Sequence, residues 1–351
     1  MTARWLTTHA EFAAIAAQWD GALESMNAGS GADNPFLLSE FLQAWADEFV
    51  PPEALRVLTF WRGGDLVGGL PLYRERRRGV AMLRALGIGF AGLSEGWSHS
   101  DTQFGSACAA ALGERDDWQY LNLPLSRSAW LEGGSLPLIT TPAISGARAH
   151  LNANFDAYLA ERPRSLQVKL GLSRRRAHAA GGWELVELQG LQAIKDLIEF
   201  QLRCNGPELY ATDPVVTPQR ERWSRFTRDM LERMAGCGRL QALELRIGGE
   251  RAAAAFGLKL GEGFNYVLTS CDRNFSRFSP GHMMFAAIIE RACALRLPYV
   301  DAFGVGEKAA GEEAGGLRRW CNEFPPQYRQ RLFHPGIGGA ALLQIGRLWK
   351  S

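Results

Sequence analysis

The sequence lacks the long apolar runs of membrane proteins and the excess of one charge that marks many nucleic-acid-binding proteins. It has no stretch of 18 or more apolar residues, and its start, MTARWLTTHAEF, has no charged segment followed by an apolar one. The net charge is only +2. We therefore expect a cytoplasmic protein with neither a signal peptide nor a spanning helix, and no nucleic-acid partner.

Sequence patterns for disulfides, metals and serine hydrolases are also missing. The six cysteines include no Cys-x-x-Cys pair, and no histidine lies at zinc-finger spacing from them. The chain has no His-Glu-x-x-His motif and no Ser-His-Asp order. We expect neither a disulfide framework nor a metal site, and we interpret most of the cysteines as small core residues.

Lysine is scarce, because only five of the 39 basic residues are lysines and the others are arginines. Arginine presents a planar, permanently charged fork that suits phosphate and carboxylate groups. A GC-rich genome produces the same bias, so the composition leaves both explanations open.

The chain itself is globular in composition and long enough for two cores. It has 351 residues, 46% hydrophobic and 22% charged, and about 150 residues per domain is typical. Residues 57–72 and 242–257 resemble each other at a constant offset of 185 positions. Each segment is predicted to form a strand, a turn of two glycines and an acidic residue, and a second strand. The offset, about half the chain, predicts a duplicated domain.

The elements around the two hairpins follow the same order. Two helices are expected before each hairpin, at 11–26 and 39–49 and again at 191–204 and 218–234. A helix and a strand are expected after it, at 105–112 and 118–124 and again at 279–295 and 298–303, with an additional strand at 264–270. The fold class is therefore α/β (α+β). We place the domains at 1–150 and 183–335, a connecting helical arm at 151–182 and a tail helix at 336–351.

The segment from Asp272 to Gly281 has the strongest signal for a binding site. Ser279 is a typical helix N-cap, and Pro280 suits the first helical position. The free N–H groups of that helix start, with Arg273 and Arg277 close by, could hold a phosphate. An ordinary capped helix is the alternative.

The order of the motifs resembles a known family. A strand, the pattern D-x-x-x-x-x-x-S-P-G, an apolar helix and the strand ending Asp301-Ala-Phe-Gly occur together, with the segment PFLLSEFLQAW at 35–45 near the start. This arrangement resembles the FemAB-like, cellulose-biosynthesis-type acetyltransferases of the GNAT superfamily. The resemblance implies two tandem GNAT-like domains, each a mixed, mainly antiparallel sheet flanked by helices. It also implies transfer of an acyl group from acyl-CoA, acetyl-CoA first of all, to an amine on a sugar or cell-envelope precursor of exopolysaccharide type.

The resemblance also assigns the residues that would bind the donor. The loop and helix start clasp the pyrophosphate of acyl-CoA in such enzymes, and here these residues are Arg273, Arg277, Ser279, Gly281 and His282. The sequence departs from the usual pattern Q/R-x-x-G-x-G/A, because Pro280 and His282 occupy the two glycine places. Proline removes one N–H group from the loop.

Candidate catalytic residues follow the last strand of the second half. Attack by a neutral amine on a thioester needs a proton acceptor, and Asp301, Glu307 and Lys308 are the candidates. Asp301 is either this base or a structural carboxylate paired with an arginine. Lys308 resembles the lysine that lies near the acceptor in FemAB-like transferases, or is a solvated loop residue. In the first half, Trp97 and Asp101 are candidates for acceptor binding.

Two other functions remain open. The FemAB resemblance allows an aminoacyl-tRNA-dependent transferase, in which the arginine runs at 74–78 and 174–176 would contact phosphates. A catalytically silent binding protein of an exopolysaccharide machine is the other alternative. The arginine runs and the tail helix also allow peripheral contact with the inner face of the membrane, although solvated runs and a tail packed on the domain explain them equally well.

Overall fold

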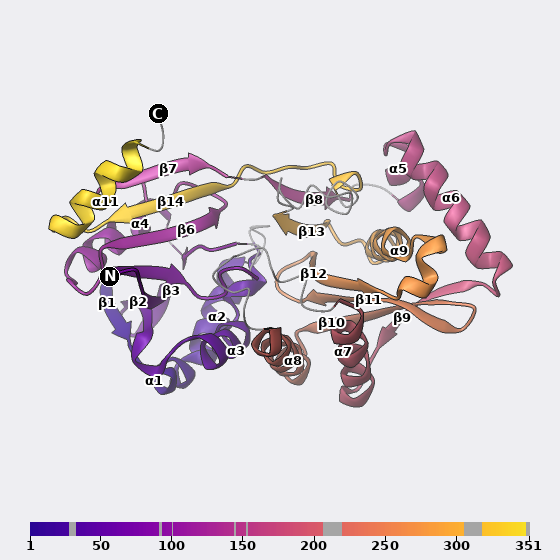
Figure 1. Cartoon of the computed structure of the whole chain (residues 1–351), viewed down its shortest axis with the longest axis horizontal. Coiled ribbons are helices and arrows are strands. Elements are labelled where there is room, and N and C mark those ends of the chain that lie inside the picture. The colour runs from indigo at the N-terminus through magenta and orange to yellow at the C-terminus, as the bar shows by residue number, and fades with distance from the viewer. Residues whose placement is uncertain are drawn as a thin grey trace. The chain divides into compact units, whose positions relative to one another are not determined.

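The computed structural model describes residues 1–27, 33–90, 93–99, 101–143, 145–151, 154–205, 220–304 and 318–348 (Figure 1). The chain forms two compact units. The first unit comprises Met1–Ala28, Phe36–Ile144 and Pro326–Ser351, and the second comprises Gly29–Pro35 and Ser145–Pro325. No helix in the described ranges is long and apolar enough to cross a membrane.

The first unit is built on a mixed sheet in which only β4 and β6 run parallel. Its strand order is β1-β2-β3-β4-β6-β14-β7, and β5 also pairs with β3. The strands are β1 (Thr2–Leu6), β2 (Leu55–Arg62), β3 (Asp65–Arg77), β4 (Val80–Ala85), β5 (Trp97–Ser98), β6 (Tyr120–Ser126), β7 (Leu138–Pro142) and β14 (Tyr328–Phe333). The helices are α1 (His9–Ala14), α2 (Ala16–Asn27), α3 (Ser39–Phe49), α4 (Asp101–Gly113) and α11 (Ile337–Leu348). On one face α4 buries Phe104, Cys108 and Leu112 against the sheet, so the core is apolar there.

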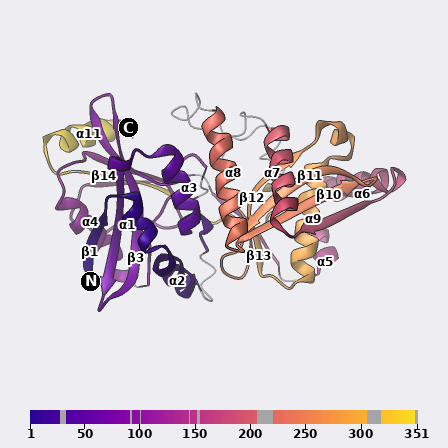
Figure 2. The ribbon, with the colours of Figure 1, turned by 90° about the horizontal axis from the view of Figure 1, so that it is seen from below.

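The second unit has a six-stranded sheet in the order β8-β13-β12-β11-β10-β9. Its strands are β8 (Gly146–His150), β9 (Trp183–Leu188), β10 (Leu240–Ile247), β11 (Glu250–Leu258), β12 (Phe264–Cys271) and β13 (Tyr299–Gly304). Its helices are α5 (Phe155–Ala160), α6 (Arg164–Ala179), α7 (Leu191–Asn205), α8 (Arg220–Gly236) and α9 (Pro280–Ala294), with a short 3₁₀ helix, η4 (Arg273–Phe278). A core shared by α5, α6 and α9 covers one face of the sheet. Figure 2 shows α7 and α8 in front of the other face.

The two predicted hairpins are confirmed, and their details repeat. The pairs β2–β3 and β10–β11 each contain a bulge, after Phe60 in one and after Leu245 in the other, again 185 positions apart. Both turns contain two glycines with positive φ angles, as a two-residue type I′ turn requires. A shared register and a shared bulge support the duplication more strongly than the residue pattern alone.

The ends of the units differ from the expected ranges. β14 lies after the second unit in sequence, yet it pairs with both β6 and β7 in the first sheet. β8 comes before the second unit's other strands, and it pairs with β13. The helical arm expected at 151–182 contributes Tyr158, Leu166 and Leu170 to the core of the second unit. Apolar burial therefore ties that arm to one unit.

Candidate functional site

The site begins where β12 and β13 separate. These parallel strands are paired only at Phe264 with Val300 and at Asn265 with Asp301. Among the described residues of β12, those after Asn265 have no ladder partner on β13. Beyond Asn265, the edge of β12 that faces β13 is therefore not paired with that strand.

Helix α9 starts beside the far end of β12. A Cβ atom on Gly281 would lie 3.5 Å from the Sγ of Cys271, the last residue of β12. The N–H of Met283 donates to the carbonyl of Ser279 at 3.1 Å, and Pro280 has no N–H. In the first turn, this leaves the N–H groups of Gly281 and His282 directed at whatever precedes the helix.

Ser279 is the N-cap residue, as predicted, but its hydroxyl does not cap the helix. Its φ and ψ of 51° and 57° are left-handed, whereas a side-chain N-cap requires an extended conformation. The reason is that Ser279 also ends η4, where its N–H donates to the carbonyl of Ser276. The expectation of a Ser279 side-chain cap was wrong, and the expected start of the helix at Pro280 is confirmed.

The two predicted arginines lie in η4, directly before this helix start. Both Arg273 and Arg277 are exposed, and the guanidinium of Arg277 lies 4.6 Å from the ring centroid of Phe278. The carbonyl of Arg277 accepts a hydrogen bond of 3.1 Å from Arg176 of α6. The start of α9 is thus surrounded by positive charge, which adds to the positive end of the helix dipole.

His282 is held in one protonation state by its surroundings. Its Nδ1 accepts a hydrogen bond of 3.3 Å from Nε1 of Trp320, so the ring proton of the neutral imidazole is on Nε2. Burial, together with the positive charges of Lys169 and Arg319, lowers the pKa of His282 to about 4. His282 is therefore neutral at pH 7 and offers a hydrogen-bond donor without adding a charge.

Asp301 lies on β13 and is almost completely buried, at 5% exposure. Its Oδ2 accepts hydrogen bonds of 2.7 and 3.1 Å from Arg148 of β8, and its Oδ1 accepts one of 2.7 Å from the N–H of Phe303. Phe303 has a positive φ of 53°, which this short hydrogen bond helps to hold. The guanidinium of Arg148 also lies 4.2 Å from the ring centroid of Tyr299, whose hydroxyl bonds to Asp33.

The structure does not bring Asp301 and the start of α9 together. Asp301 is opposite Asn265, whereas α9 begins beside Cys271, six residues further along β12. At about 3.3 Å per residue the separation is about 20 Å. A single ligand that reaches both places must therefore be elongated.

Three predicted residues cannot be placed as side chains. Glu307 and Lys308 lie outside the described residues. Asp101 begins α4, but its side chain is likewise outside the described part. Trp97 is described and is 3% exposed, with its ring centroid 5.1 Å from that of Trp19 in a T-shaped contact.

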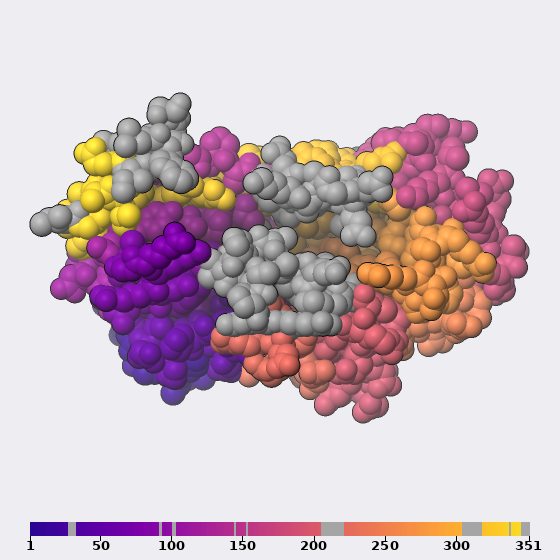
Figure 3. All heavy atoms as spheres, viewed as in Figure 1, coloured from indigo at the N-terminus to yellow at the C-terminus, as the bar shows by residue number. Residues whose placement is uncertain are grey.

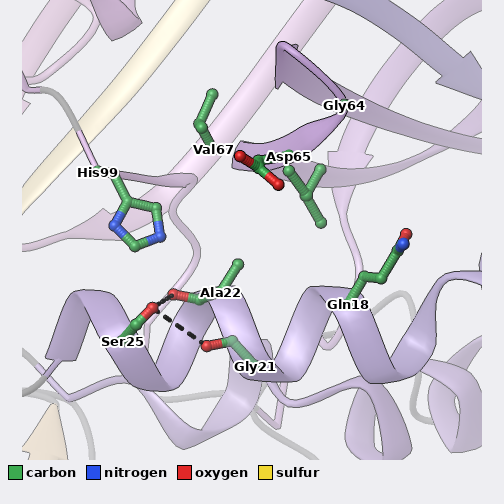
Figure 4. Close-up of a pocket in the computed structure, with 9 residues that line it drawn as sticks. Gln18, Gly21, Ala22, Ser25, Gly64, Asp65, Val67 and His99 are labelled. Carbon is green, nitrogen blue, oxygen red and sulfur yellow. Dashed lines mark hydrogen bonds between the residues drawn. The ribbon is translucent and has the colours of Figure 1, made fainter.

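The loop that contains Trp97 does reach a cavity of the first unit. This cavity, of about 430 Å³, lies between α2 and the tip of the β2–β3 hairpin (Figure 4). His99 borders it together with Gln18, Asp65 and Val67, and the N–H of His99 donates to the carbonyl of Val67 at 3.0 Å. His99, rather than Trp97, therefore faces this cavity.

Sequence reasoning missed Arg148 and Trp320, the partners of Asp301 and His282. Arg148 lies 153 positions before Asp301, and Trp320 lies 38 positions after His282. No local motif connects either pair. Only the pairing of β8 with β13 and the packing of Trp320 in the core bring them together.

Comparison with known proteins agrees with this geometry. Residues 167–313, less than half of the chain, match the family described as acetyltransferase (GNAT) domain. The match lies within the second unit. The matched range contains β12, η4, α9 and β13, and at this level the expectation of a GNAT-type N-acyltransferase is confirmed. The search of curated proteins finds no significant match.

Solved structures show the same fold over nearly the whole chain. The crystal structure of FemX is 10% identical, covers 98% of this chain and 99% of its own, and gives a TM-score of 0.59. A conserved protein of unknown function from Bacteroides thetaiotaomicron is 12% identical and covers 91% and 97%, with a TM-score of 0.56. The C-terminal domain of a putative lysylphosphatidylglycerol synthetase from Agrobacterium fabrum is 12% identical and covers 97% of both chains, with a TM-score of 0.53. The expected fold of two tandem GNAT-like domains is confirmed.

Proposed function

We propose that the protein transfers an acyl group from acyl-CoA, with acetyl-CoA as the first candidate, to the amine of an amino sugar or a related cell-envelope precursor of exopolysaccharide type. The supporting observation is the start of α9 at Pro280, beside the end of β12 and directly after the exposed Arg273 and Arg277. Because acyl-CoA is a cytoplasmic metabolite, the proposal includes a cytoplasmic location. The FemAB-like and cellulose-biosynthesis-type relationship belongs to the same proposal.

In this proposal the donor binds at both ends of β12, with its pyrophosphate at the start of α9 and its thioester at the other end. The N–H groups of Gly281 and His282, with Arg273 and Arg277, hold the pyrophosphate, and the neutral His282 adds a donor from Nε2. The pantetheine arm runs along β12 from Cys271 to Asn265, so that the thioester lies towards Asn265 and Asp301. An elongated donor of this kind accounts for two groups of candidate residues that lie about 20 Å apart.

In the reaction, the amine nitrogen attacks the thioester carbonyl carbon, a C–N bond forms, and the C–S bond breaks to release CoA as a thiol. The amine loses one proton, for which Asp301 or Glu307 is the proposed acceptor, and this proton then passes to the departing CoA thiolate. Lys308 is proposed to lie near the acceptor substrate. Trp97 and Asp101 stay proposed acceptor residues. The ion pair with Arg148 favours the alternative in which Asp301 is a structural carboxylate and Glu307 is the base.

Calorimetry with acetyl-CoA and with longer acyl-CoAs tests the donor. The variant R273A/R277A should weaken binding by about tenfold or more, because it removes two charges from the pyrophosphate. The control R62A/R329A removes two exposed arginines of β2 and β14, outside the arginine runs, and should bind as the wild type does. Folded protein that binds none of these thioesters, or a control that loses as much affinity as the test variant, would overturn the assignment.

Aminoacyl-tRNA is the second candidate donor. The likeness to FemX and to a putative lysylphosphatidylglycerol synthetase favours it, since the latter's description names a lipid carrying an amino acid. Binding of charged tRNA would weaken steeply with salt, because each neutralised phosphate releases counterions. Transfer of the amino acid from charged tRNA, without any acetyl-CoA binding, would establish this alternative in place of the first.

A further inference from the structure

Helix α6 has apolar side chains on two opposite faces. Leu166, Leu170 and Ala177 form the stripe that packs into the core of the second unit. On the opposite side, Val168 is 54% exposed and Leu172 is 38% exposed. These two residues are four positions apart, so they lie side by side on the surface. Figure 3 shows this helix, in pink, at the surface of the second unit.

The charges of α6 all have the same sign. Its 16 residues, RSLQVKLGLSRRRAHA, contain five arginines and lysines and no acidic residue. Arg174 faces inward, where it pairs with Glu290 at 2.6 Å and lies 4.8 Å from the ring centroid of Trp183. Of the arginine run at 174–176, Arg174 is therefore structural, and Arg175 and Arg176 are exposed.

The remaining cations surround the exposed apolar pair. Arg164, Lys169, Arg175 and Arg176 are all exposed. Within the described part of the chain, none of the four has a carboxylate at ion-pair distance, and Arg176 donates to a carbonyl oxygen. We name these four residues, with Val168 and Leu172, the outer face of α6.

We propose that the outer face of α6 docks on a membrane surface rich in anionic phospholipid. Aliphatic side chains enter the boundary between headgroups and acyl chains, while unpaired arginines and lysines at their edges bind lipid phosphates. RNA would use the cations but not Val168 and Leu172, because single-stranded RNA is bound by aromatic stacking and duplex RNA by polar contacts. The exposed aliphatic pair therefore favours a lipid surface.

Flotation of the full chain with vesicles tests this inference. Vesicles of equal parts phosphatidylcholine and phosphatidylglycerol should carry the protein to the top of the gradient, and pure phosphatidylcholine vesicles should not. Binding should disappear in about 1 M salt, where the Debye length is about 3 Å. R164E/R175E and, separately, V168S/L172S should each reduce binding by about tenfold or more.

Two matched controls separate the outer face of α6 from general surface properties. R62E/R329E makes the same change of net charge on β2 and β14, outside the arginine runs, and L191S/L295S removes two other exposed leucines. Both controls should bind as the wild type does, with thermal unfolding confirming that every variant is folded. Equal loss in test and control pairs, flotation with both kinds of vesicle, or no flotation overturns the proposal. So does tRNA binding that R164E/R175E abolishes while vesicles are not bound. The assay needs no donor or acceptor, so its failure leaves the proposed function standing.

Discussion

Asp301 and His282 show what a sequence can and cannot reveal about single residues. Asp301 was predicted as a site residue from its place in an apolar strand, and His282 from the resemblance to GNAT enzymes. Their states, however, depend on Arg148 and Trp320, which the fold brings from other parts of the chain. A carboxylate paired with arginine and a histidine kept neutral differ from the same residues in solution, because burial strengthens each interaction.

The buried pair Arg148–Asp301 gives a prediction about stability. Replacing Arg148 by methionine should lower the free energy of unfolding by about 3–5 kcal/mol, because it leaves Asp301 buried without its counter-charge. Replacing Arg228, whose pair with Glu199 is exposed, should cost only about 0–1 kcal/mol. Urea unfolding of the two variants measures the difference. Equal losses would show that the buried carboxylate is not held by Arg148.

His282 gives a prediction about pH. Its pKa is about 4 in the folded protein and about 6.5 in an unfolded chain, so the unfolded chain takes up a proton in this window that the folded protein does not. The free energy of unfolding therefore has its full value above pH 6.5. It decreases as the pH falls towards 4, because the unfolded chain gains a proton on His282 that the folded protein does not. H282Q should therefore show a smaller loss of stability between pH 6.5 and 4.

The measurement is the free energy of unfolding in urea at several pH values. H150Q, which removes an exposed histidine of β8, is the control and should keep the wild-type slope. A wild-type slope in H282Q would mean that other groups cause the acid sensitivity.

At the scale of elements, the hairpins were predictable and the helix start was only partly so. Two glycines and an acidic residue between alternating strands specify a tight turn locally, and both turns formed as expected. The serine-proline start of α9 fixed the helix boundary. The conformation of Ser279 could not be predicted, because η4 ends on the same residue, and a six-residue 3₁₀ helix has little sequence signal.

The duplicated turns allow a matched pair of substitutions. Gly63 and Gly248 occupy the same turn position, with φ of 60° and 61°. A Cβ on Gly63 meets nothing within 4 Å, whereas one on Gly248 would lie 2.5 Å from the carbonyl oxygen of Ala180. G63A should cost about 1–2 kcal/mol for the left-handed conformation, and G248A should cost more. Thermal unfolding compares them, and equal costs would show that the end of α6 adjusts freely.

At the scale of the whole molecule, the two-domain organisation was predictable from the repeat, but the origin of each sheet's strands was not. Residues 57–72 and 242–257 carry the repeat in their own sequence. The sequences of β14 and β8 do not indicate which sheet each strand joins, because pairing between strands far apart in the chain depends on the edges that the rest of the fold leaves open. The expected domain end at 335 therefore assigned β14 to the second domain, whereas the structure places it in the first unit.

Shortening the chain tests the placement of β14. A chain ending at residue 325 should lose hydrogen-exchange protection in β6 and β7, the two neighbours of β14, because a strand inside the first sheet is missing. Protection in β10, β11 and β12 of the second unit should persist. A chain ending at residue 335 keeps β14 and is the control. Loss of protection in both units alike would contradict two separate cores.

The position of β14 also determines when the first unit can fold on the ribosome. The side chain of Gln330 accepts a hydrogen bond from the N–H of Leu131, 199 positions earlier, so this sheet stays incomplete until β14 has been made. At about 10 residues per second, β6 waits about 20 s for its neighbour. During that interval its edge is open to wrong partners. Newly made chains should thus depend on chaperones until synthesis passes residue 333.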